Sequence, residues 1–295
     1  MSIFKEITLI IVTYNSDNLI TQNLEILKKF NIIIIDNSSH ENIKSIVKYF
    51  DNIKYIKPKK NLGYGKANNI GVFNALTKYV LIVNPDIILK LDSIEELYYN
   101  YKSYEHDNVG LVAPSLYDIT FNRRTNGTIS FIKKINKYKI NNSDNNLPSG
   151  NMCCDFVVGC CFLIQKNYFL KLGGFNENFF MYFEDNDLCD KIIKNGKSII
   201  EIPSSKFIHL QNSSSNKNFF TQQKLSIVHK ISEFIYLKKN LPLIFFYKNI
   251  LFQFFDYFQR FFSNIVRFRF NNCYKNLLRL ISIILFVTSL YKIIF

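Results

Sequence analysis

Three carboxylates, Glu184, Asp185 and Asp187, lie within four positions and directly follow an aromatic run at residues 179–183. Buried aromatic side chains lower the local dielectric, and neighbouring like charges resist joint ionisation, so the carboxylate pKa values should rise and spread. A carboxylate with a raised pKa suits a general base that takes a proton from a hydroxyl near neutral pH. The same residues would also stabilise the first turn of a helix running to Asn195. This segment alone does not decide between the two interpretations.

The first half of the chain predicts the strands and helices that must position these carboxylates. Short apolar runs alternate there with amphipathic segments. This pattern is typical of a parallel β-sheet covered by helices on both faces. It predicts strands at 7–13, 32–35 and 79–83, and helices at 19–30, 43–50 and 66–76. Each predicted strand is followed by polar residues, at 14–16, 36–39 and 84–86. Any one of these groups would make an ordinary turn. Because ligands bind at the carboxyl ends of parallel strands, the three together predict one shared pocket.

Further elements follow in the second half. We expect a helix at 92–104 and strands at 109–113, 155–164 and 198–202, the last of them ended by Pro203. Residues 122–150 are rich in Asn, Lys and Ser, and we interpret them as a long surface excursion close to the acceptor. After about residue 219 the pattern becomes helical, with an amphipathic stripe at 247–270.

The positive charge of the chain is unevenly distributed. The formal net charge is +14, and residues 241–295 hold seven Lys or Arg and one acid, Asp256, among many aromatics. Such a segment suits an anionic membrane surface or nucleic acid. We expect no nucleic-acid partner, since neither zinc-finger spacing nor an aromatic-glycine signature is present. The uncharged part of the apolar segment 277–295 is shorter than the ~20 residues that span a bilayer. This length favours a shallow membrane anchor. A helix packed on the main domain or on a partner chain stays an alternative.

The six cysteines show no C-x-x-C spacing, so neither a disulfide framework nor a structural zinc site is expected. Their apolar neighbours indicate small core residues. Lys5 and Glu6 lead directly into the first predicted strand, without the apolar run of a signal peptide. We therefore expect a reduced, cytoplasmic catalytic part.

Several short motifs occur in one order along residues 7 to about 215. They lie at residues 11–15, 35–39, 61–71, 83–86, 157–160 and 172–175, in the acidic run through Cys189, and at His209 followed by Ser213 and Ser214. Taken together, they resemble the family 2 glycosyltransferases, especially the rhamnosyltransferase-like branch that builds bacterial surface polysaccharides. Any single motif would be weak evidence, but the ordered set is specific.

The resemblance implies an α/β protein with a GT-A fold, which is a Rossmann-like, mostly parallel central sheet with flanking helices. We assign this domain to residues 1–220 and a helical, membrane-associated region to residues 221–295. The resemblance also implies a nucleotide diphosphate sugar as donor, a divalent metal (Mg²⁺ or Mn²⁺) and inversion at the anomeric carbon.

The resemblance further implies a role for each matched residue. Asp185 would be the general base with Glu184 beside it, and Gly159 and Asp187 would contact the acceptor. Asp86 and His209 would bind the metal. The donor would be bound by residues at the strand tips and in the glycine-rich loop, namely Thr13, Tyr14, Asn15, Asp36, Asn61, Gly63, Lys66, Asn68 and Asn84.

Physical reasons support several of these roles. A carboxylate at Asp36 can accept the imide N–H of uracil or thymine. Gly63 and Gly65 let the backbone approach the nucleotide and open a helix whose N-terminus favours phosphate.

The chain also departs from the family pattern. It has one acid, Asp86, where many relatives have two. The rhamnosyltransferase-like branch also has a single acid there. Lys191 stands where relatives often carry Arg, and Phe156 replaces a frequent Trp.

We therefore expect an inverting glycosyltransferase that is cytoplasmic, is attached peripherally to the inner face of the cell membrane, and acts on a lipid-linked or growing glycan. Branch resemblance favours rhamnose, and other hexoses stay open. A processive synthase is disfavoured, because it would need several membrane spans and a Trp-containing motif, and the chain has no Trp. The alternative from another class is a non-catalytic, membrane-associated sugar-nucleotide binding protein. The presence of Asp36, Asp86 and Asp185 argues against it.

Overall fold

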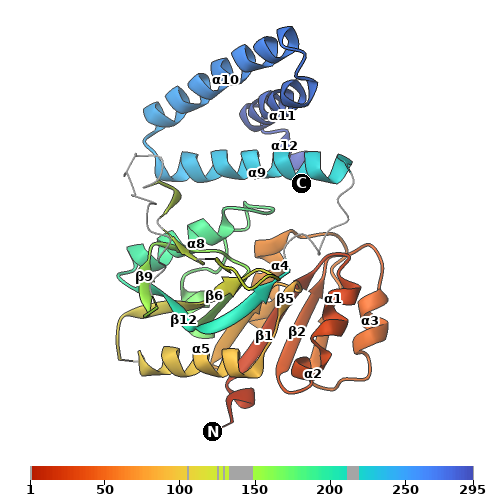
Figure 1. Ribbon diagram of the computed structural model, residues 1–295, viewed down its shortest axis with the longest axis vertical. Coiled ribbons are helices and arrows are strands. Elements are labelled where there is room, and N and C mark those ends of the chain that lie inside the picture. The colour runs from red at the N-terminus through yellow and green to blue at the C-terminus, as the bar shows by residue number, and fades with distance from the viewer. Residues whose placement is uncertain are drawn as a thin grey trace. The chain divides into compact units, whose positions relative to one another are not determined.

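The computed structural model describes residues 2–104, 106–124, 126–128, 130–132, 149–210 and 219–294 (Figure 1). The chain packs as two compact units. The first comprises Met1–Glu177 and Glu184–Ser215, and the second comprises Asn178–Phe183 and Asn216–Phe295. Much of the surface excursion expected at 122–150, together with Ser213 and Ser214, lies outside the described residues.

A twisted sheet forms the centre of the first unit (Figure 1). Its strand order is β3 (Ile53–Ile56), β2 (Asn31–Asp36), β1 (Ile7–Thr13), β4 (Tyr79–Val83), β11 (Cys161–Gln165), β6 (Val109–Tyr117), β12 (Ser198–His209) and β5 (Ile87–Ile88). The strands β3, β2, β1 and β4 are parallel, as are β6 and β12, while β11 runs antiparallel to both of its neighbours. The sheet predicted from the apolar runs at 7–13, 32–35 and 79–83 is therefore confirmed.

Shorter strands complete this unit. β7 (Arg123–Arg124) pairs with β6, β9 (Met152–Cys154) pairs with β12, and β8 (Gly127–Thr128) pairs with β10 (Phe156–Val157). The single strand expected at 155–164 is thus divided between β10 and β11. The expectation that a strand ends at Pro203 is wrong, because β12 continues to His209 through a register shift between Ile202 and Lys206. Proline lacks a backbone donor and is tolerated where the ladder is irregular.

Helices cover both faces of the sheet because every residue of the central strands points alternately to one side or the other. Leu9 and Ile11 pack with α1 (Asp17–Gln22), α3 (Asn42–Val47) and α5 (Leu91–Ser103) residues in one apolar cluster. Ile10 and Ile33 pack in a second cluster with α4 (Tyr64–Asn74), α7 (Lys166–Lys171) and α8 (Glu184–Lys194). A short 3-10 helix, η1 (Ile3–Lys5), precedes β1.

The single helix predicted at 19–30 is broken into α1 and α2 (Leu24–Leu27). The break falls at Asn23, whose buried amide donates to the carbonyl oxygen of Ile87 (2.8 Å) and accepts from the backbone N–H of Leu89 (2.9 Å). These long-range hydrogen bonds satisfy backbone groups beside β5, and no local pattern in the sequence indicates them.

The cysteines only partly follow the expectation of core residues. Cys160, Cys161 and Cys189 are buried, whereas Cys153 is exposed, so that interpretation is wrong for Cys153.

The second unit is helical and contains α9 (Phe219–Asn240), α10 (Leu243–Val266), α11 (Phe270–Val287) and α12 (Tyr291–Ile294). Phe286 of α11 lies at the centre, with ring centroids 5.4 Å from Phe234 and 5.9 Å from Phe246. The stripe predicted at 247–270 corresponds to α10, which begins earlier and ends at Val266. Among the described helices, none has both the length and the apolar character that crossing a bilayer requires.

Candidate functional site

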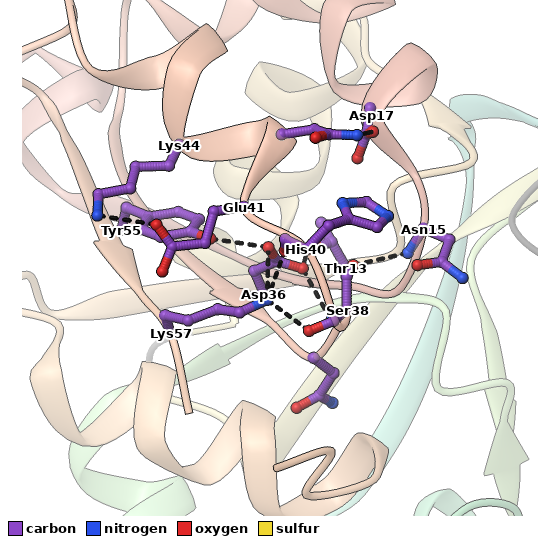
Figure 2. Close-up of polar contacts among 12 residues, drawn as sticks. Thr13, Asn15, Asp17, Asp36, Ser38, His40, Glu41, Lys44, Tyr55 and Lys57 are labelled. Atoms are coloured by element: carbon purple, nitrogen blue, oxygen red, sulfur yellow. Dashed lines mark hydrogen bonds and ion pairs between the residues drawn. The ribbon is translucent and has the colours of Figure 1, made fainter. Parts of the chain in front are cut away.

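The tips of β1 and β2 lie side by side, with Thr13 paired in register with Asp36. The Thr13 hydroxyl donates to Oδ1 of Asp36 (3.2 Å), and the backbone N–H of Asn15 donates to Oγ of Ser38 (2.8 Å). Asn15 adopts a left-handed backbone conformation, with φ of 53°. Tyr14, between Thr13 and Asn15 in the chain, is exposed, and its contact with a nucleotide stays a prediction. Figure 2 shows this arrangement.

Asp36 is fully buried and is held by donors from the protein itself (Figure 2). Besides Thr13, it accepts from the backbone N–H of Ser38 (3.0 Å), the Tyr55 hydroxyl (2.8 Å) and the Lys57 ammonium (3.2 Å). Burial alone would raise the pKa of Asp36, but the hydrogen bonds from Ser38, Tyr55 and Lys57 outweigh it and lower the pKa. A carboxylate offers about four acceptor positions. An imide N–H that binds Asp36 must therefore displace or share one of these donors.

Tyr55 and Lys57 are the residues of this site that sequence reasoning missed. Tyr55 lies in β3 and Lys57 directly follows it. This strand was not predicted, because none of its four residues is buried. The Lys57 ammonium also donates to the carbonyl oxygen of His40 (2.7 Å), which fixes the turn after β2. The sequence signal that could have predicted this strand is the mix of apolar and polar residues at 53–56, which follows shortly after the second predicted strand.

The glycine-rich loop is tied to the tip of β2 through one amide. The Asn37 side chain donates to the carbonyl oxygen of Gly63 (3.0 Å) and accepts from the backbone N–H of Leu62 (3.2 Å). Asn61 accepts from the N–H of Gly63 (2.9 Å), and Gly63 has a φ of 78°, a conformation that glycine adopts without strain. No side chain caps the N-terminus of α4 that follows. Its first N–H groups are therefore available to an anion such as a diphosphate.

Tyr64, the first residue of α4, connects this loop to the carboxylates. Its hydroxyl donates to the carbonyl oxygen of Gly159 (2.6 Å), and the N–H of Gly159 donates to Oδ2 of Asp185 (3.1 Å). A Cβ atom at Gly159 would lie only 3.0 Å from the Cβ of Asp185, and one at Gly65 would lie 3.5 Å from the Cβ of Glu184. The contact at Gly159 is tight, so a larger residue there would press on Asp185, whereas the tight contact at Gly65 is with the Cβ of Phe175 (3.0 Å).

Burial raises the pKa of both catalytic candidates. The pKa of Glu184 is raised well above its usual value by burial and then by the charge of Asp185. The pKa of Asp185 is also raised by burial, although hydrogen bonds from Gly159 and Asn186 partly oppose the change. Glu184 is 5% exposed, and among the described residues its Oε2 atom has no hydrogen-bond partner. The rise expected from the aromatic context is therefore found at both residues.

The two predicted metal ligands lie next to each other. His209 pairs in register with Ile87 of β5, and its Nε2 atom lies 3.4 Å from Oδ1 of Asp86. Neither β5 nor the continuation of β12 was predicted, yet together they bring these two residues into contact. Within the described ranges, no group of three or more His, Cys, Asp or Glu side chains could hold a metal ion.

A divalent cation nevertheless fits this pair as a partial site. Magnesium-type sites commonly use one or two carboxylates and take their other ligands from phosphate and water. The side-chain oxygen of Asn84, two residues before Asp86, is buried without a hydrogen-bond partner in the described part of the chain. The backbone N–H of Asn84 donates to the carbonyl oxygen of Cys160 (2.8 Å), and burial, followed by the charges of Asp86 and Asp185, raises the pKa of the Cys160 thiol. Asp86 and Asp185 therefore both lie near the buried Cys160.

The remaining predicted residues have partners of their own. Lys66 forms an ion pair with Glu177 (2.9 Å), at a partly exposed position. Asp187 is buried and lies 3.4 Å from the Lys191 ammonium, which also donates to the carbonyl oxygen of Gly174 (2.8 Å). This arrangement anchors α8, and a contact between Asp187 and the acceptor stays a prediction.

Asn68 is different, because its side-chain oxygen is buried and has no partner among the residues that the structure describes. The amide donates to the carbonyl oxygen of Tyr64 (3.1 Å). Its oxygen is thus an acceptor without an internal hydrogen bond, and the contact with the donor substrate stays a prediction.

Comparisons with known proteins identify the family of this chain. The family model described as "Glycosyl transferase family 2" matches residues 8–173, and a model described as "N-terminal domain of galactosyltransferase" matches residues 145–213. The rhamnosyltransferase WbbL of Escherichia coli (strain K12) is 30% identical over 254 residues, which cover 78% of this chain and 92% of that protein. An N-acetylglucosaminyl-diphospho-decaprenol L-rhamnosyltransferase of Mycobacterium tuberculosis is 24% identical, over 70% of this chain and 74% of that protein.

A solved structure shows the same fold. The mannosyltransferase PcManGT from Pyrobaculum calidifontis, in complex with GDP-Man and Mn²⁺, superposes with a TM-score of 0.53. The match has 17% identity and covers 79% of this chain and 63% of that longer one. The first unit therefore has a GT-A-like glycosyltransferase fold.

The chain belongs to glycosyl transferase family 2. It is a glycosyltransferase, an enzyme that transfers a sugar from a nucleotide sugar, and it is similar to rhamnosyltransferases. The alternative of a non-catalytic binding protein is set aside on this basis.

The contact between Gly159 and Asp185 gives a first testable prediction. Gly159→Ala places a methyl group against Asp185 and displaces its carboxylate. We expect kcat for sugar transfer to fall about tenfold or more, since small misplacements of a catalytic group are costly. Binding of the nucleoside diphosphate, measured by calorimetry, should be unchanged. Gly150→Ala is the matched control, because no atom lies within 4 Å of a Cβ at that position. Equal kcat values for the two variants would contradict this role of Gly159.

The raised pKa of Asp185 predicts the pH dependence of catalysis. A general base must be ionised, so kcat/KM should decrease as the pH falls through the pKa of Asp185. Because burial raises that pKa, the acidic limb should lie above the ordinary value of 3.8. Initial rates of nucleoside diphosphate release from about pH 3 to pH 9, with melting temperatures recorded at each pH, provide the measurement. An acidic limb at or below 3.8 in the folded enzyme would be incompatible with the prediction.

Proposed function

We propose that the protein is an inverting glycosyltransferase that moves a hexose, with rhamnose favoured, onto a hydroxyl of a lipid-linked or growing glycan. The observation that carries the proposal is the position of Asp185. It is a carboxylate of raised pKa that Gly159 holds beside the loop which opens α4. A single general base next to a diphosphate site is the arrangement that direct displacement requires.

Asp185 would take the proton of the acceptor hydroxyl while that oxygen attacks the anomeric carbon from the face opposite the leaving nucleoside diphosphate. One displacement of this kind inverts the anomeric configuration. The uncapped N–H groups at the start of α4 would bind the diphosphate. Glu184, which is buried and has a raised pKa, would hold an acceptor or sugar hydroxyl by accepting or donating a hydrogen bond.

Asp86 and His209 would hold a divalent cation, Mg²⁺ or Mn²⁺. When bound, the cation would neutralise charge that develops on the diphosphate. The Mn²⁺ in the complex of the Pyrobaculum calidifontis mannosyltransferase supports this assignment, as does the 3.4 Å approach of the two side chains.

The nature of the sugar and of the acceptor rests on the relatives. The name of the Escherichia coli relative specifies a rhamnosyltransferase. The name of the Mycobacterium tuberculosis relative specifies a decaprenol-diphosphate-linked sugar as its acceptor. By analogy, we propose rhamnose as the sugar and a polyprenyl-diphosphate-linked saccharide as the acceptor for this chain.

We also propose that the second unit binds the inner face of the cell membrane peripherally, in the cytoplasm. One face of α10 exposes a stripe of apolar side chains at helical spacing, including Phe245, Phe252, Phe255 and Phe262. Basic residues of the same unit, among them Lys248 and Arg260, lie within or beside this sequence. An apolar stripe with nearby cations suits the interface of an anionic bilayer. Such a position would bring the enzyme to a lipid-linked acceptor.

The base assignment predicts the behaviour of Asp185→Asn. The amide keeps the shape of the side chain but is not a base, so we expect transfer to fall by about 10²–10⁴-fold. Binding of the donor sugar nucleotide with Mg²⁺ or Mn²⁺ should stay normal by thermal shift. Asp190→Asn, on the same helix, is the control and should retain activity. Undiminished transfer by Asp185→Asn would reject the base assignment.

The membrane proposal predicts that Phe252→Ser/Phe255→Ser weakens binding to vesicles that contain phosphatidylglycerol. These side chains are 73% and 63% exposed, so their replacement should leave the fold intact. We expect at least a tenfold loss of vesicle affinity in flotation assays, because each inserted phenyl group contributes ~1.5–3 kcal/mol when fully buried. Phe73→Ser/Leu76→Ser, at positions of the first unit that are 72% and 98% exposed, is the control. Unchanged vesicle binding, or a change in oligomeric state instead, would contradict the proposal.

A further inference from the structure

The turn between β10 and β11, residues 158–160, carries the backbone groups that contact the candidate base. The N–H of Gly159 donates to Oδ2 of Asp185 (3.1 Å), and the carbonyl oxygen of Gly159 accepts from the Tyr64 hydroxyl (2.6 Å). Both contacts require the turn to keep its backbone conformation. The groups that fix the two ends of this turn therefore also affect the position of the base.

The side chain of Asn126 bridges these two ends. Its oxygen accepts from the backbone N–H of Val158 (2.9 Å), and its amide group donates to the carbonyl oxygen of Cys161 (3.4 Å). The same amide group donates to the carbonyl oxygen of Pro114 in β6 (3.1 Å). Asn126 is fully buried, so its hydrogen bonds tie the end of β10, the start of β11 and β6 together inside the sheet domain.

The residue type at position 126 matters because the three backbone partners differ in kind. Val158 offers a donor, whereas Cys161 and Pro114 offer acceptors. An amide side chain supplies an acceptor oxygen and a donor NH₂ group at once. An ionised carboxylate of the same size can only accept, and an apolar side chain can do neither. Asn126 is therefore matched to this turn by its chemistry as well as by its size.

Asn126 is itself held in place by its neighbours. Gly127, the next residue, pairs with Val157 between β8 and β10, and its N–H donates to Oε2 of Glu201 (2.6 Å). Glu201 is fully buried in β12 and forms an ion pair with Arg123 (3.3 Å). The backbone that carries Asn126 is thus anchored to β12 on one side and to β10 on the other.

We propose that Asn126 is a positioning residue for catalysis, which holds the turn between Val158 and Cys161 so that the N–H of Gly159 stays directed at Asp185. Asn126, the turn and Asp185 all belong to the first unit. The proposal rests on the proposed function, in which Asp185 is the general base. It assigns no contact with substrate to Asn126.

The test compares Asn126→Ala with Asn52→Ala. Asn52 is the matched control, because its amide group also donates to two backbone carbonyl oxygens, those of Leu27 and Phe30 (2.7 Å each), neither of which belongs to the site. Both variants should have a lower melting temperature. For Asn126→Ala alone we expect kcat to fall about tenfold or more, because small displacements of a catalytic group are costly. The KM for the donor should stay within twofold of the parent value.

The pH profile gives a readout that a loss of stability alone would not change. The hydrogen bond from Gly159 lowers the pKa of Asp185, and a relaxed turn would weaken that bond. The pKa of Asp185 should therefore be higher in Asn126→Ala. Because a general base must be ionised, the acidic limb of kcat/KM should move to higher pH, while Asn52→Ala keeps the parent limb. Both variants retain the titratable side chains that the charge of Asp185 influences, namely Glu184, Tyr64, Cys160 and Cys189.

Three results would overturn the positioning role. The first is a kcat for Asn126→Ala within twofold of the parent. The second is an equal loss of kcat in Asn52→Ala, which would indicate general destabilisation. The third is a lowered kcat with an unshifted acidic limb, since the loss would then not act through Asp185. If Asn126→Ala does not fold, Asn126→Asp takes its place. Its ionised carboxylate still accepts from Val158 but cannot donate to Cys161, so we expect kcat to fall there too.

Asp185→Asn, assayed beside these variants, separates this proposal from the proposed function. If Asp185→Asn still transfers sugar, the base assignment fails, and the positioning role fails with it. If Asp185→Asn is inactive while Asn126→Ala keeps the parent kcat, only the positioning role fails.

Discussion

The hydrogen bond from the backbone of Gly159 to Asp185 is the interaction on which the site depends. It joins the antiparallel part of the sheet to α8, and through the carbonyl oxygen of Gly159 it also joins Tyr64 and the glycine-rich loop. A Cβ at that position would lie 3.0 Å from the Cβ of Asp185, so any residue larger than glycine would require the Asp185 side chain to shift. The glycine-rich loop and the candidate base are therefore linked by two hydrogen bonds that the backbone N–H and C=O of one residue, Gly159, make on either side.

The site also contains acceptor oxygens that the fold leaves unsatisfied. The side-chain oxygens of Asn68 and Asn84 and one oxygen of Glu184 are buried without a hydrogen-bond partner in the described ranges. A buried acceptor without a donor costs about 1–3 kcal/mol of stability. All three belong to motifs that resemble those of sugar-transferring enzymes. Sugar hydroxyls or a cation would satisfy these oxygens on binding. The unpaired oxygens thus make the free protein less stable and leave acceptors for the ligand.

Much of the site was accessible from the sequence because it lies at strand ends. Continuous β-branched runs set β1, β2 and β4, and the polar residues after them had to meet at one edge of the sheet. The acidic residues could be singled out because an aromatic run preceded them. The contact between Asp86 and His209, by contrast, depends on β12 continuing past Pro203 and on the short strand β5, features that only long-range pairing creates.

Other features were beyond local patterns for the same reason. Lys57 reaches Asp36 from the end of a half-exposed strand, and Asn23 divides a predicted helix because its partners are more than 60 residues away. The left-handed conformations of Tyr182 and Phe183 contradict their own residue preferences, so no propensity argument could find them. In each case a contact between distant segments outweighs the local tendency.

A structure of the enzyme with Mn²⁺, an intact nucleotide sugar analogue and an acceptor would test the central claim most directly. The account predicts the diphosphate at the start of α4 and the metal on Asp86 and His209. It also predicts a carboxylate oxygen of Asp185 about 3 Å from the acceptor hydroxyl, on the side of the anomeric carbon opposite the diphosphate. A donor bound away from α4, or an acceptor hydroxyl beyond the reach of Asp185, would contradict it.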